Sequence, residues 1–380
     1  MAAVLPPSEV ANEDKATRYH RLRRRAAVLS ACVGAIFLLL LFVSGWSASL
    51  RAAAVRLTGG SFSGTVLLYV LVVALLHELI QLPLAFYEGV TLERRYELST
   101  ESTARWWKDH LKGWAIGTVF GLMAAAAIWT LIRWSADFWW LWAALAFSLV
   151  VVALAQLAPV LLLPLFYEVK PLDRQTLAAR LAALADRAGA PVLGTFEWRL
   201  SDRTKKANAA LAGIGRTRRI LLSDTLLADY SDDEIEVILA HELAHHVHHD
   251  IWRAIGFETL LIALGFYLAD AALTAWSAAF GVMGKDDIAA LPLLLLTMGA
   301  VSLMLMPLRN ALSRSHERRA DRYALTMTRN LDAFITAMKR LAAQNLAEED
   351  PSPLVEALFH SHPSISARIS AARSFKLDPA

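Results

Sequence analysis

Residues 231–250 read Ser-Asp-Asp-Glu-Ile-Glu-Val-Ile-Leu-Ala-His-Glu-Leu-Ala-His-His-Val-His-His-Asp, and a long apolar run follows them. Ser231 followed three residues later by Glu234 is the pattern of a capping box, which predicts that a helix begins here. The apolar residues after the box recur with helical periodicity. We therefore expect the helix to run through His249, where it can continue into the apolar run beyond.

The chain around this stretch is strongly apolar. Hydrophobic residues make up 56% of its 380 residues, against about 45–50% in a typical soluble domain. The net charge is only +3, which gives no support for binding to nucleic acid. Cys32 is the single cysteine, which excludes a disulfide framework and a cysteine-rich zinc site. Any metal must therefore be held by histidines and carboxylates.

Six apolar runs are long enough to cross a bilayer, which takes about 20 helical residues. They cover approximately residues 26–46, 64–87, 114–133, 138–166, 251–280 and 288–308. The first run is too long for the apolar core of a cleaved signal peptide. We expect it to stay in the protein as the first span.

Lysines and arginines are concentrated before the first span, between the second and third spans, and after the sixth. The positive-inside rule then predicts that both termini and the large loop before the fifth span are cytoplasmic. We expect a multi-pass protein of the cell (inner) membrane, surrounded by the lipid bilayer. The expected parts are a cytoplasmic N-terminal segment (1–25), a four-span membrane domain (26–167), a cytoplasmic domain (168–250), a two-span hairpin (251–308) and cytoplasmic C-terminal helices (309–380).

The large cytoplasmic loop has the patterns of a small folded domain. Residues 172–188 have helical periodicity, and Gly189 and Pro191 end the pattern. Strands are expected at residues 195–201, 208–215 and 218–223. The predicted fold class is thus an all-α multi-span membrane protein that carries a small α+β cytoplasmic domain.

The helix after Ser231 carries the motif His241-Glu242-Leu243-Ala244-His245. Residues four apart lie on one face of a helix, so both imidazoles can bind one ion, and neutral imidazole suits zinc. Glu242 lies beside them, where its carboxylate can accept a proton from a water that the metal activates. The alternative is a histidine-rich surface, because three further histidines follow within the next four residues.

A third metal ligand is expected from Glu317, in the sequence Ser313-Arg-Ser-His-Glu-Arg-Arg-Ala-Asp321. Two spans separate Glu317 from His245, and an even number of crossings returns the chain to the same side. Asp321 lies one turn further on and can accept a hydrogen bond from a ligand imidazole. His316 is a competing ligand, and a solvated ion-pair face is the alternative for the whole segment.

Two residues near the C-terminus fit a role in the transition state. His362 precedes a short helix that contains Arg368. An imidazole and a guanidinium can stabilise the oxyanion of a tetrahedral intermediate. Taken singly, each residue could equally be structural.

Together these motifs resemble the type I CAAX prenyl endopeptidase family, from about the second span to Ala372. The likeness rests on the motif that begins at His241, on Glu317 with Asp321, and on His362-Pro363 with Arg368. Members of this family are multi-span zinc proteases with a large water-filled intramembrane chamber. The resemblance therefore implies that the six spans enclose a chamber. The extra N-terminal span of eukaryotic members is missing, which indicates a prokaryotic version.

The resemblance also implies roles for the metal-centre residues. His241, His245 and Glu317 would bind one catalytic zinc ion. Glu242 would be the general base and later the proton donor. Asp321 would orient a ligand.

Four further residues receive roles in the same way. His362 and Arg368 would stabilise the oxyanion. Asn208 and Ala209 would pair with the substrate backbone as an added strand. The sequence departs from the family at Asp250, where many members carry a further histidine, so the far end of the motif helix is expected to differ.

The expected protein is thus a membrane-embedded zinc metalloendopeptidase. Its partners would be peptide or protein substrates, including membrane-associated or lipid-modified ones, cleaved at the cytoplasmic face. One alternative is an HtpX-like quality-control protease, which has fewer N-terminal spans. Another is a catalytically silent membrane scaffold or transporter, although a silent relative has no need to keep Glu242.

Overall fold

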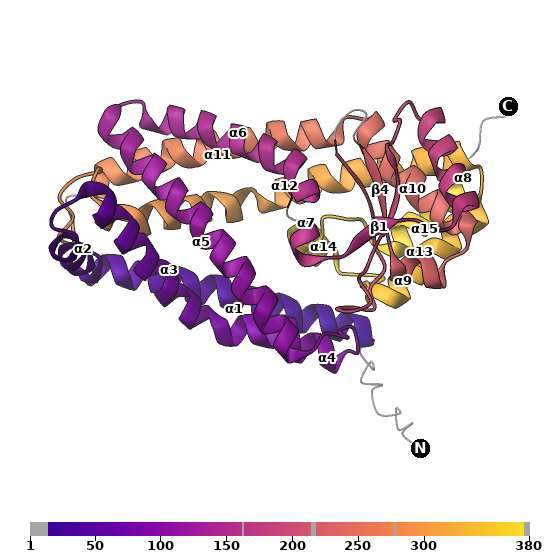
Figure 1. Ribbon diagram of the computed structural model, residues 1–380, viewed down its shortest axis with the longest axis horizontal. Coiled ribbons are helices and arrows are strands. Elements are labelled where there is room, and N and C mark those ends of the chain that lie inside the picture. The colour runs from indigo at the N-terminus through magenta and orange to yellow at the C-terminus, as the bar shows by residue number, and fades with distance from the viewer. Residues whose placement is uncertain (1–13, 162, 214–217, 277–278, 376–380) are drawn as a thin grey trace, which may run out of the picture.

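The computed structural model describes residues 14–161, 163–213, 218–276 and 279–375 (Figure 1). Parts of several predicted segments lie outside the described residues. They are residues 1–13 of the N-terminal segment, 162 of the fourth span, 214–215 of the second strand, 277–278 of the fifth span and 376–380 of the C-terminal segment.

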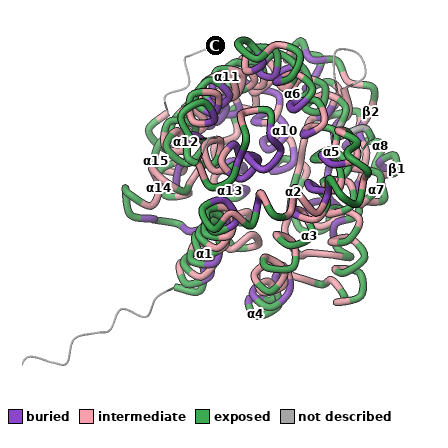
Figure 2. The backbone as a smooth tube through the Cα atoms, turned by 90° about the vertical axis from the view of Figure 1, so that its left-hand side faces the viewer, coloured by how far each residue is buried: buried purple, intermediate pink, exposed green. Residues whose placement is uncertain are grey.

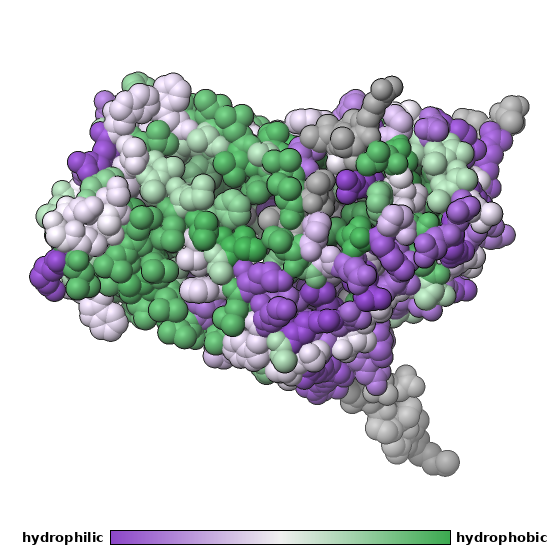
Figure 3. Space-filling model, viewed as in Figure 1, coloured by the Kyte–Doolittle hydropathy of each residue, from purple (hydrophilic) through white to green (hydrophobic). Residues whose placement is uncertain are grey.

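The prediction of six membrane spans is confirmed, because six helices are long and apolar enough to cross a bilayer. The helices are α1 (Lys15–Val43), α3 (Phe62–Phe86), α5 (Thr103–Trp134), α6 (Trp139–Leu161), α11 (Asp250–Trp276) and α12 (Leu291–Thr328). Their outward surface forms a broad apolar area on the left of Figure 3, whereas the right-hand end is mainly hydrophilic. Seen end on, the long helices are arranged as a ring, with the buried α10 visible through its middle (Figure 2).

Three of these helices extend well beyond the predicted apolar runs. The first, α1, begins at Lys15 instead of residue 26, so the polar segment before the first span is partly helical. Helix α5 begins at Thr103 instead of residue 114. The last, α12, continues past residue 308 to Thr328 as one helix. Bilayer thickness limits only the apolar part of a helix, and the charged residues beyond it are good helix formers. The extension of α12 carries Glu317 away from the membrane-spanning part.

Three short elements of the membrane region were not predicted. They are α2 (Trp46–Leu57), the π-helix η1 (Tyr87–Leu92) and α4 (Glu93–Arg95).

Hydrogen bonds between spans hold the membrane region together. Glu78 on α3 accepts a bond from His110 on α5 at 2.6 Å, and Gln81 on α3 donates to the Ser30 carbonyl on α1 at 2.9 Å.

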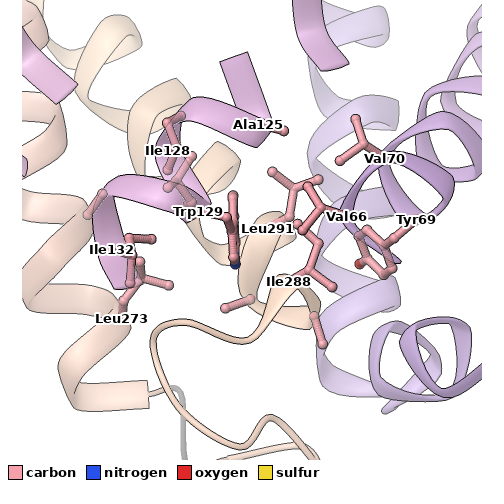
Figure 4. Close-up of a cluster of buried hydrophobic side chains, with 14 of the residues drawn as sticks. Val66, Tyr69, Val70, Ala125, Ile128, Trp129, Ile132, Leu273, Ile288 and Leu291 are labelled. Carbon is pink, nitrogen blue, oxygen red and sulfur yellow. The ribbon is translucent and has the colours of Figure 1, made fainter. Parts of the chain in front are cut away.

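An apolar core fills the end of the bundle that lies away from the sheet. Trp129 and Ile132 of α5 pack there with Tyr69 of α3 and Leu273 of α11 (Figure 4). The short 3-10 helix η3 (Ile288–Ala290) and the start of α12 complete the cluster, and Trp129 is fully buried. This apolar packing therefore lies at one end of the ring, and the sheet lies at the other end (Figure 1).

The chain between the fourth and fifth spans forms a four-stranded sheet in the order β1-β2-β4-β3. Its strands are β1 (Val169–Pro171), β2 (Gly194–Trp198), β3 (Ala209–Ala212) and β4 (Arg219–Ser223). The pairs β1–β2 and β3–β4 are antiparallel and β2–β4 is parallel. The three predicted strands are confirmed with shorter bounds, β1 was not predicted, and β3 forms one edge of the sheet.

Besides the helix that carries the histidine motif, the described part of the chain contains six more helices. They are α7 (Leu163–Phe166), α8 (Gln175–Arg187), α9 (Asp224–Asp229), α13 (Leu331–Asn345), α14 (Pro353–Phe359) and α15 (Ile365–Ser374). Leu177 and Leu181 of α8 pack against Ile235, Leu239 and Leu243 of the helix that carries the histidine motif. These leucines are essentially inaccessible to solvent, so the motif helix lies in the core of the domain that carries the sheet.

That motif helix is α10 (Asp232–Val247), and it is shorter than predicted. The capping box is present, with both of its reciprocal hydrogen bonds between Ser231 and Glu234. The prediction that the helix runs through His249 is wrong, because His249 has a φ of 56° and breaks the helix. A left-handed residue cannot continue a right-handed helix. The span α11 therefore starts anew at Asp250 in a different direction.

Candidate metal centre

His241 and His245 project from one face of α10. Their ring centroids are 5.0 Å apart and their planes are nearly perpendicular, at 85°. Leu239 and Leu243 on the opposite face are fully buried and fix the rotation of the helix. His241 itself is only 8% exposed, so an ion held here would be largely shielded from water.

Glu317 on α12 faces both imidazoles. Its Oε2 lies 3.2 Å from His241 Nε2, and its Oε1 lies 3.4 Å from His245 Nε2. One nitrogen of each histidine and one oxygen of Glu317 all lie within 4.8 Å of one another. In the part of the chain that the structure describes, these three side chains are the group that could hold a metal ion. These three side chains thus lie together, as expected from the sequence, although two membrane spans separate Glu317 from His245.

Two further carboxylates bind the other nitrogen of each imidazole. Asp321 Oδ1 lies 2.9 Å from His241 Nδ1, and Asp250 Oδ2 lies 3.1 Å from His245 Nδ1. Because each Nδ1 donates to a carboxylate, each neutral ring leaves a lone pair at Nε2. Both lone pairs then face Glu317.

The fit of this site to a metal ion can be judged from Glu317. Its Oε2 is buried and has no hydrogen-bond partner in the described part of the chain, although it lies beside two polar rings. A buried carboxylate oxygen without a partner is costly. Two imidazole nitrogens and a carboxylate that converge on one point would bind a cation there, which accounts for the orphaned oxygen.

The pKa values of the motif residues reflect these contacts in the metal-free protein. Burial lowers the pKa of His241, but its contacts with the Asp321 and Glu317 carboxylates outweigh burial and raise that pKa to about 9. The pKa of His245 is also raised, because its contact with Glu317 outweighs burial. Burial raises the pKa of Glu242, the residue between them in the motif. An arriving cation must therefore displace a proton from His241 at neutral pH.

His362 and Arg368 both lie next to the centre, in different ways. His362 Nε2 is 3.5 Å from Glu317 Oε1, and its Nδ1 contacts the Ser361 hydroxyl at 2.9 Å. Arg368 donates two hydrogen bonds to Asp321, at 2.8 and 2.5 Å, and its Nη2 is 4.0 Å from Glu317 Oε2. Its guanidinium thus holds Asp321 in place behind His241.

The remaining histidines of the two motifs lie outside this group. His316 Nε2 is 3.9 Å from Asp250 Oδ1, so it lies on the far side of that carboxylate from His245. The His248 ring packs edge-on against Tyr323 at 5.5 Å. Neither belongs to the ligand set.

Asn208 and Ala209 lie at the start of the edge strand β3. The Asn208 carbonyl accepts from Ser223 N, and its N–H donates to the Ser223 hydroxyl, both at 3.0 Å. Ala209 is paired with Leu222 of β4. The Asn208 side chain is exposed.

Sequence reasoning missed the part that Asp250 plays in this centre. Its side chain is 4% exposed, and it pairs with Arg319 of α12 as well as with His245. The difference from the family pattern at this position was the only signal. The contact depends on the break at His249, which a helical pattern does not reveal.

Six membrane-spanning helices and a buried centre of two histidines and one glutamate define a membrane metalloprotease. Residues 171–376 match peptidase family M48, and residues 7–168 match the N-terminal region of CAAX prenyl proteases, which is described as five membrane helices.

Known proteins resemble the chain over most of its length. The metalloprotease YhfN of Bacillus subtilis, which is described as uncharacterized, is 32% identical over 98% of this chain and 87% of its own. CAAX prenyl protease 1 of Saccharomyces cerevisiae is 29% identical over 78% of this chain and 69% of its own. The crystal structure of S. mikatae Ste24p has the same fold, with a TM-score of 0.84, 22% identity, and coverage of 96% of this chain and 91% of the other.

The chain belongs to peptidase family M48. The fold is the chamber type of the Ste24 proteases, which confirms the expected fold class. The match to the CAAX prenyl protease N-terminal region agrees with the two spans expected before residue 87 and speaks against the alternative with fewer N-terminal spans.

Proposed function

We propose that the protein is a zinc metalloendopeptidase whose single ion is held by His241, His245 and Glu317. The observation that carries this proposal is the convergence of two Nε2 atoms and one carboxylate on one buried point. Two imidazoles and one carboxylate are a usual ligand set of catalytic zinc, and they leave a coordination position free. When bound, the ion would supply Lewis-acid activation of a water and of the scissile carbonyl.

Glu242 is the general base in this proposal. It follows His241 on α10, and burial raises the pKa of its carboxyl toward the range in which it can both accept and return a proton. Glu242 takes a proton from the attacking water and then gives it to the leaving amine. His362 Nε2 and the Arg368 guanidinium lie beside Glu317 and stabilise the negative charge that develops on the carbonyl oxygen.

The substrate in this proposal is a peptide or protein segment in extended conformation, including membrane-associated or lipid-modified ones. The edge strand β3, from Asn208 and Ala209 onward, offers backbone groups to such a segment as an added strand. Three of the four residues Ala209–Ala212 are alanines, so they allow close approach of the substrate backbone.

The substitution Glu242→Gln tests the mechanism. It preserves the shape of the side chain but removes its ability to accept a proton. We expect the purified full-length variant to keep its zinc and to lose peptide hydrolysis by about 100-fold or more. The matched control Glu236→Gln, on the same helix, should hydrolyse normally. Hydrolysis at the unaltered rate by Glu242→Gln would remove the general base from the mechanism and favour a silent scaffold.

The orientation is part of the same proposal. We infer that the protein lies in the cell (inner) membrane, with both termini, the cytoplasmic domain 168–250 and the C-terminal helices 309–380 in the cytoplasm, because lysines and arginines gather on that side. The spans then form a four-span domain (26–167) and a two-span hairpin (251–308).

Cysteine labelling tests this orientation after Cys32→Ser removes the single native thiol. Asp137 lies in the exposed turn between α5 and α6, and Asp332 is exposed on α13. We expect a membrane-impermeant maleimide to label Asp137→Cys in intact cells and Asp332→Cys only after permeabilisation. Labelling in the reverse order would place the active site on the outer face.

A further inference from the structure

A second pocket opens beside the metal centre, between α1 and the segment that joins α14 to α15. Its volume is about 550 Å³, and it is lined by His20, Arg23 and Arg24 of α1, by Phe359 at the end of α14, and by His360 and His362 of the joining segment. His362 also lies 3.5 Å from Glu317. The pocket wall therefore reaches the metal centre itself.

The wall of this pocket carries positive charge that the protein does not fully neutralise. Arg24 pairs with Glu348 at 2.5 Å, and Glu348 also contacts His360 at 3.3 Å. Arg23 contacts only the Tyr19 hydroxyl, at 3.3 Å, and pairs with no carboxylate in the described part of the chain. The Glu93 carboxylate, which accepts a hydrogen bond from the same Tyr19 hydroxyl, is already paired with Lys206 at 2.9 Å.

We propose that this pocket binds a carboxylate of the peptide that is cleaved at the metal centre, with Arg23 as its main partner and Arg24 beside it. Guanidinium groups bind carboxylates through paired, charge-assisted hydrogen bonds. A peptide supplies such a group from its C-terminus or from an Asp or Glu side chain. Phe359 is 43% exposed in the same wall and provides an apolar contact for a neighbouring side chain. This inference rests on the proposed function, because it assigns the pocket to the substrate of that site.

The link to His362 favours a peptide over a membrane lipid as the occupant. Arginines before a first span commonly contact lipid headgroups, and this accounts for a basic helix end in general. Contact with lipid headgroups does not explain why the Glu348 carboxylate pairs with both Arg24 and His360. His360 is only two residues from His362. The arginines are thus connected to the segment that touches the metal centre. A substrate held at β3 on one side and at Arg23 on the other would be fixed at two points.

Peptide binding tests the proposal separately from catalysis. The full-length Glu242→Gln protein is titrated with a fluorescent peptide of apolar residues that has a free C-terminal carboxylate, with the same peptide amidated, and with the amidated peptide carrying one Glu near its end. Fluorescence anisotropy gives each Kd. We expect the free acid to bind about tenfold or more tightly than the amide.

The arginine variants show where this preference originates. Arg23→Gln in the same protein should bring the Kd ratio of amide to acid close to one. Arg25→Gln, an exposed residue of the same helix outside the pocket, should leave the ratio unchanged. Since Arg23 is itself exposed, its replacement does not threaten folding, and Arg23→Gln/Arg24→Gln extends the test.

The third peptide identifies the source of the carboxylate. Recovery of tight binding assigns the pocket to an acidic side chain, and no recovery assigns it to the peptide C-terminus. Equal Kd values for acid and amide, or a preference that survives the double variant, would overturn the proposal and leave the arginines to lipid headgroups. Hydrolysis of the amidated peptide by the unaltered protein reports the proposed function independently of these outcomes.

Discussion

The orientation of two imidazoles decides whether this site can hold a cation. Asp321 and Asp250 each accept a hydrogen bond from an Nδ1, at 2.9 and 3.1 Å, and so turn both Nε2 atoms toward Glu317. Such outer carboxylates fix the tautomer of a ligand histidine and make it a better electron donor. Arg368 in turn holds Asp321, so the arrangement is fixed before any ion binds.

Metal binding should depend on pH because His241 carries a proton in the metal-free protein. Its pKa is raised to about 9, and only the neutral ring can bind a cation. Zinc affinity should therefore fall by about tenfold for each pH unit below about 9. Calorimetric titration of the metal-free protein in two buffers of different ionisation enthalpy should show about one or more protons released per ion. Zinc binding without proton release near neutral pH would contradict the raised pKa.

The sequence allowed most of these residues to be predicted. The spacing of His241 and His245 and the even number of spans before Glu317 were sufficient to predict that these three side chains lie together. The contact between Asp250 and His245 was missed, since it requires the chain to turn at His249. The hydrogen bonds from Arg368 to Asp321 were also missed. Arg368 lies near both Asp321 and Glu317, and spacing along the sequence does not decide which carboxylate it binds.

The corner between α10 and α11 is the element that completes the centre. His249 has a φ of 56°, which ends α10 and lets α11 begin at Asp250, close to the ring of His245. A continuous helix would carry residue 250 away from that ring, because residues five apart lie on different faces. The helical pattern of the sequence runs through this corner without interruption, so periodicity alone could not predict the break.

Removing the charge at this corner should weaken metal binding. Asp250→Asn keeps the size of the side chain but cannot stabilise the imidazole of His245 in the same way. We expect zinc affinity to fall about 10- to 100-fold, as is common when such an outer partner is replaced. Competition with a chromophoric chelator measures the change. Asp173→Asn, whose side chain is 90% exposed, is the control, and equal affinities in the two variants would show that Asp250 only supports the fold.

Across the whole molecule, the fold brings α10 and α12 together from opposite ends of a membrane hairpin. Hydropathy was sufficient to predict the six spans, because long apolar segments leave few alternatives in a bilayer. It did not predict α2, η1 or β1, which are short and stabilised by contacts with distant segments. The long extension of α12 was likewise beyond hydropathy, although it is the extension that places Glu317 opposite His241.

The zinc content of the purified full-length protein tests most directly whether one ion joins these two helices. Mass spectrometry with an inductively coupled plasma should find about one zinc per chain in the unaltered protein. Glu317→Gln should lose most of it, whereas Glu349→Gln, at an exposed position, should keep it. A full equivalent of zinc in Glu317→Gln, or none in the unaltered protein, would contradict the account.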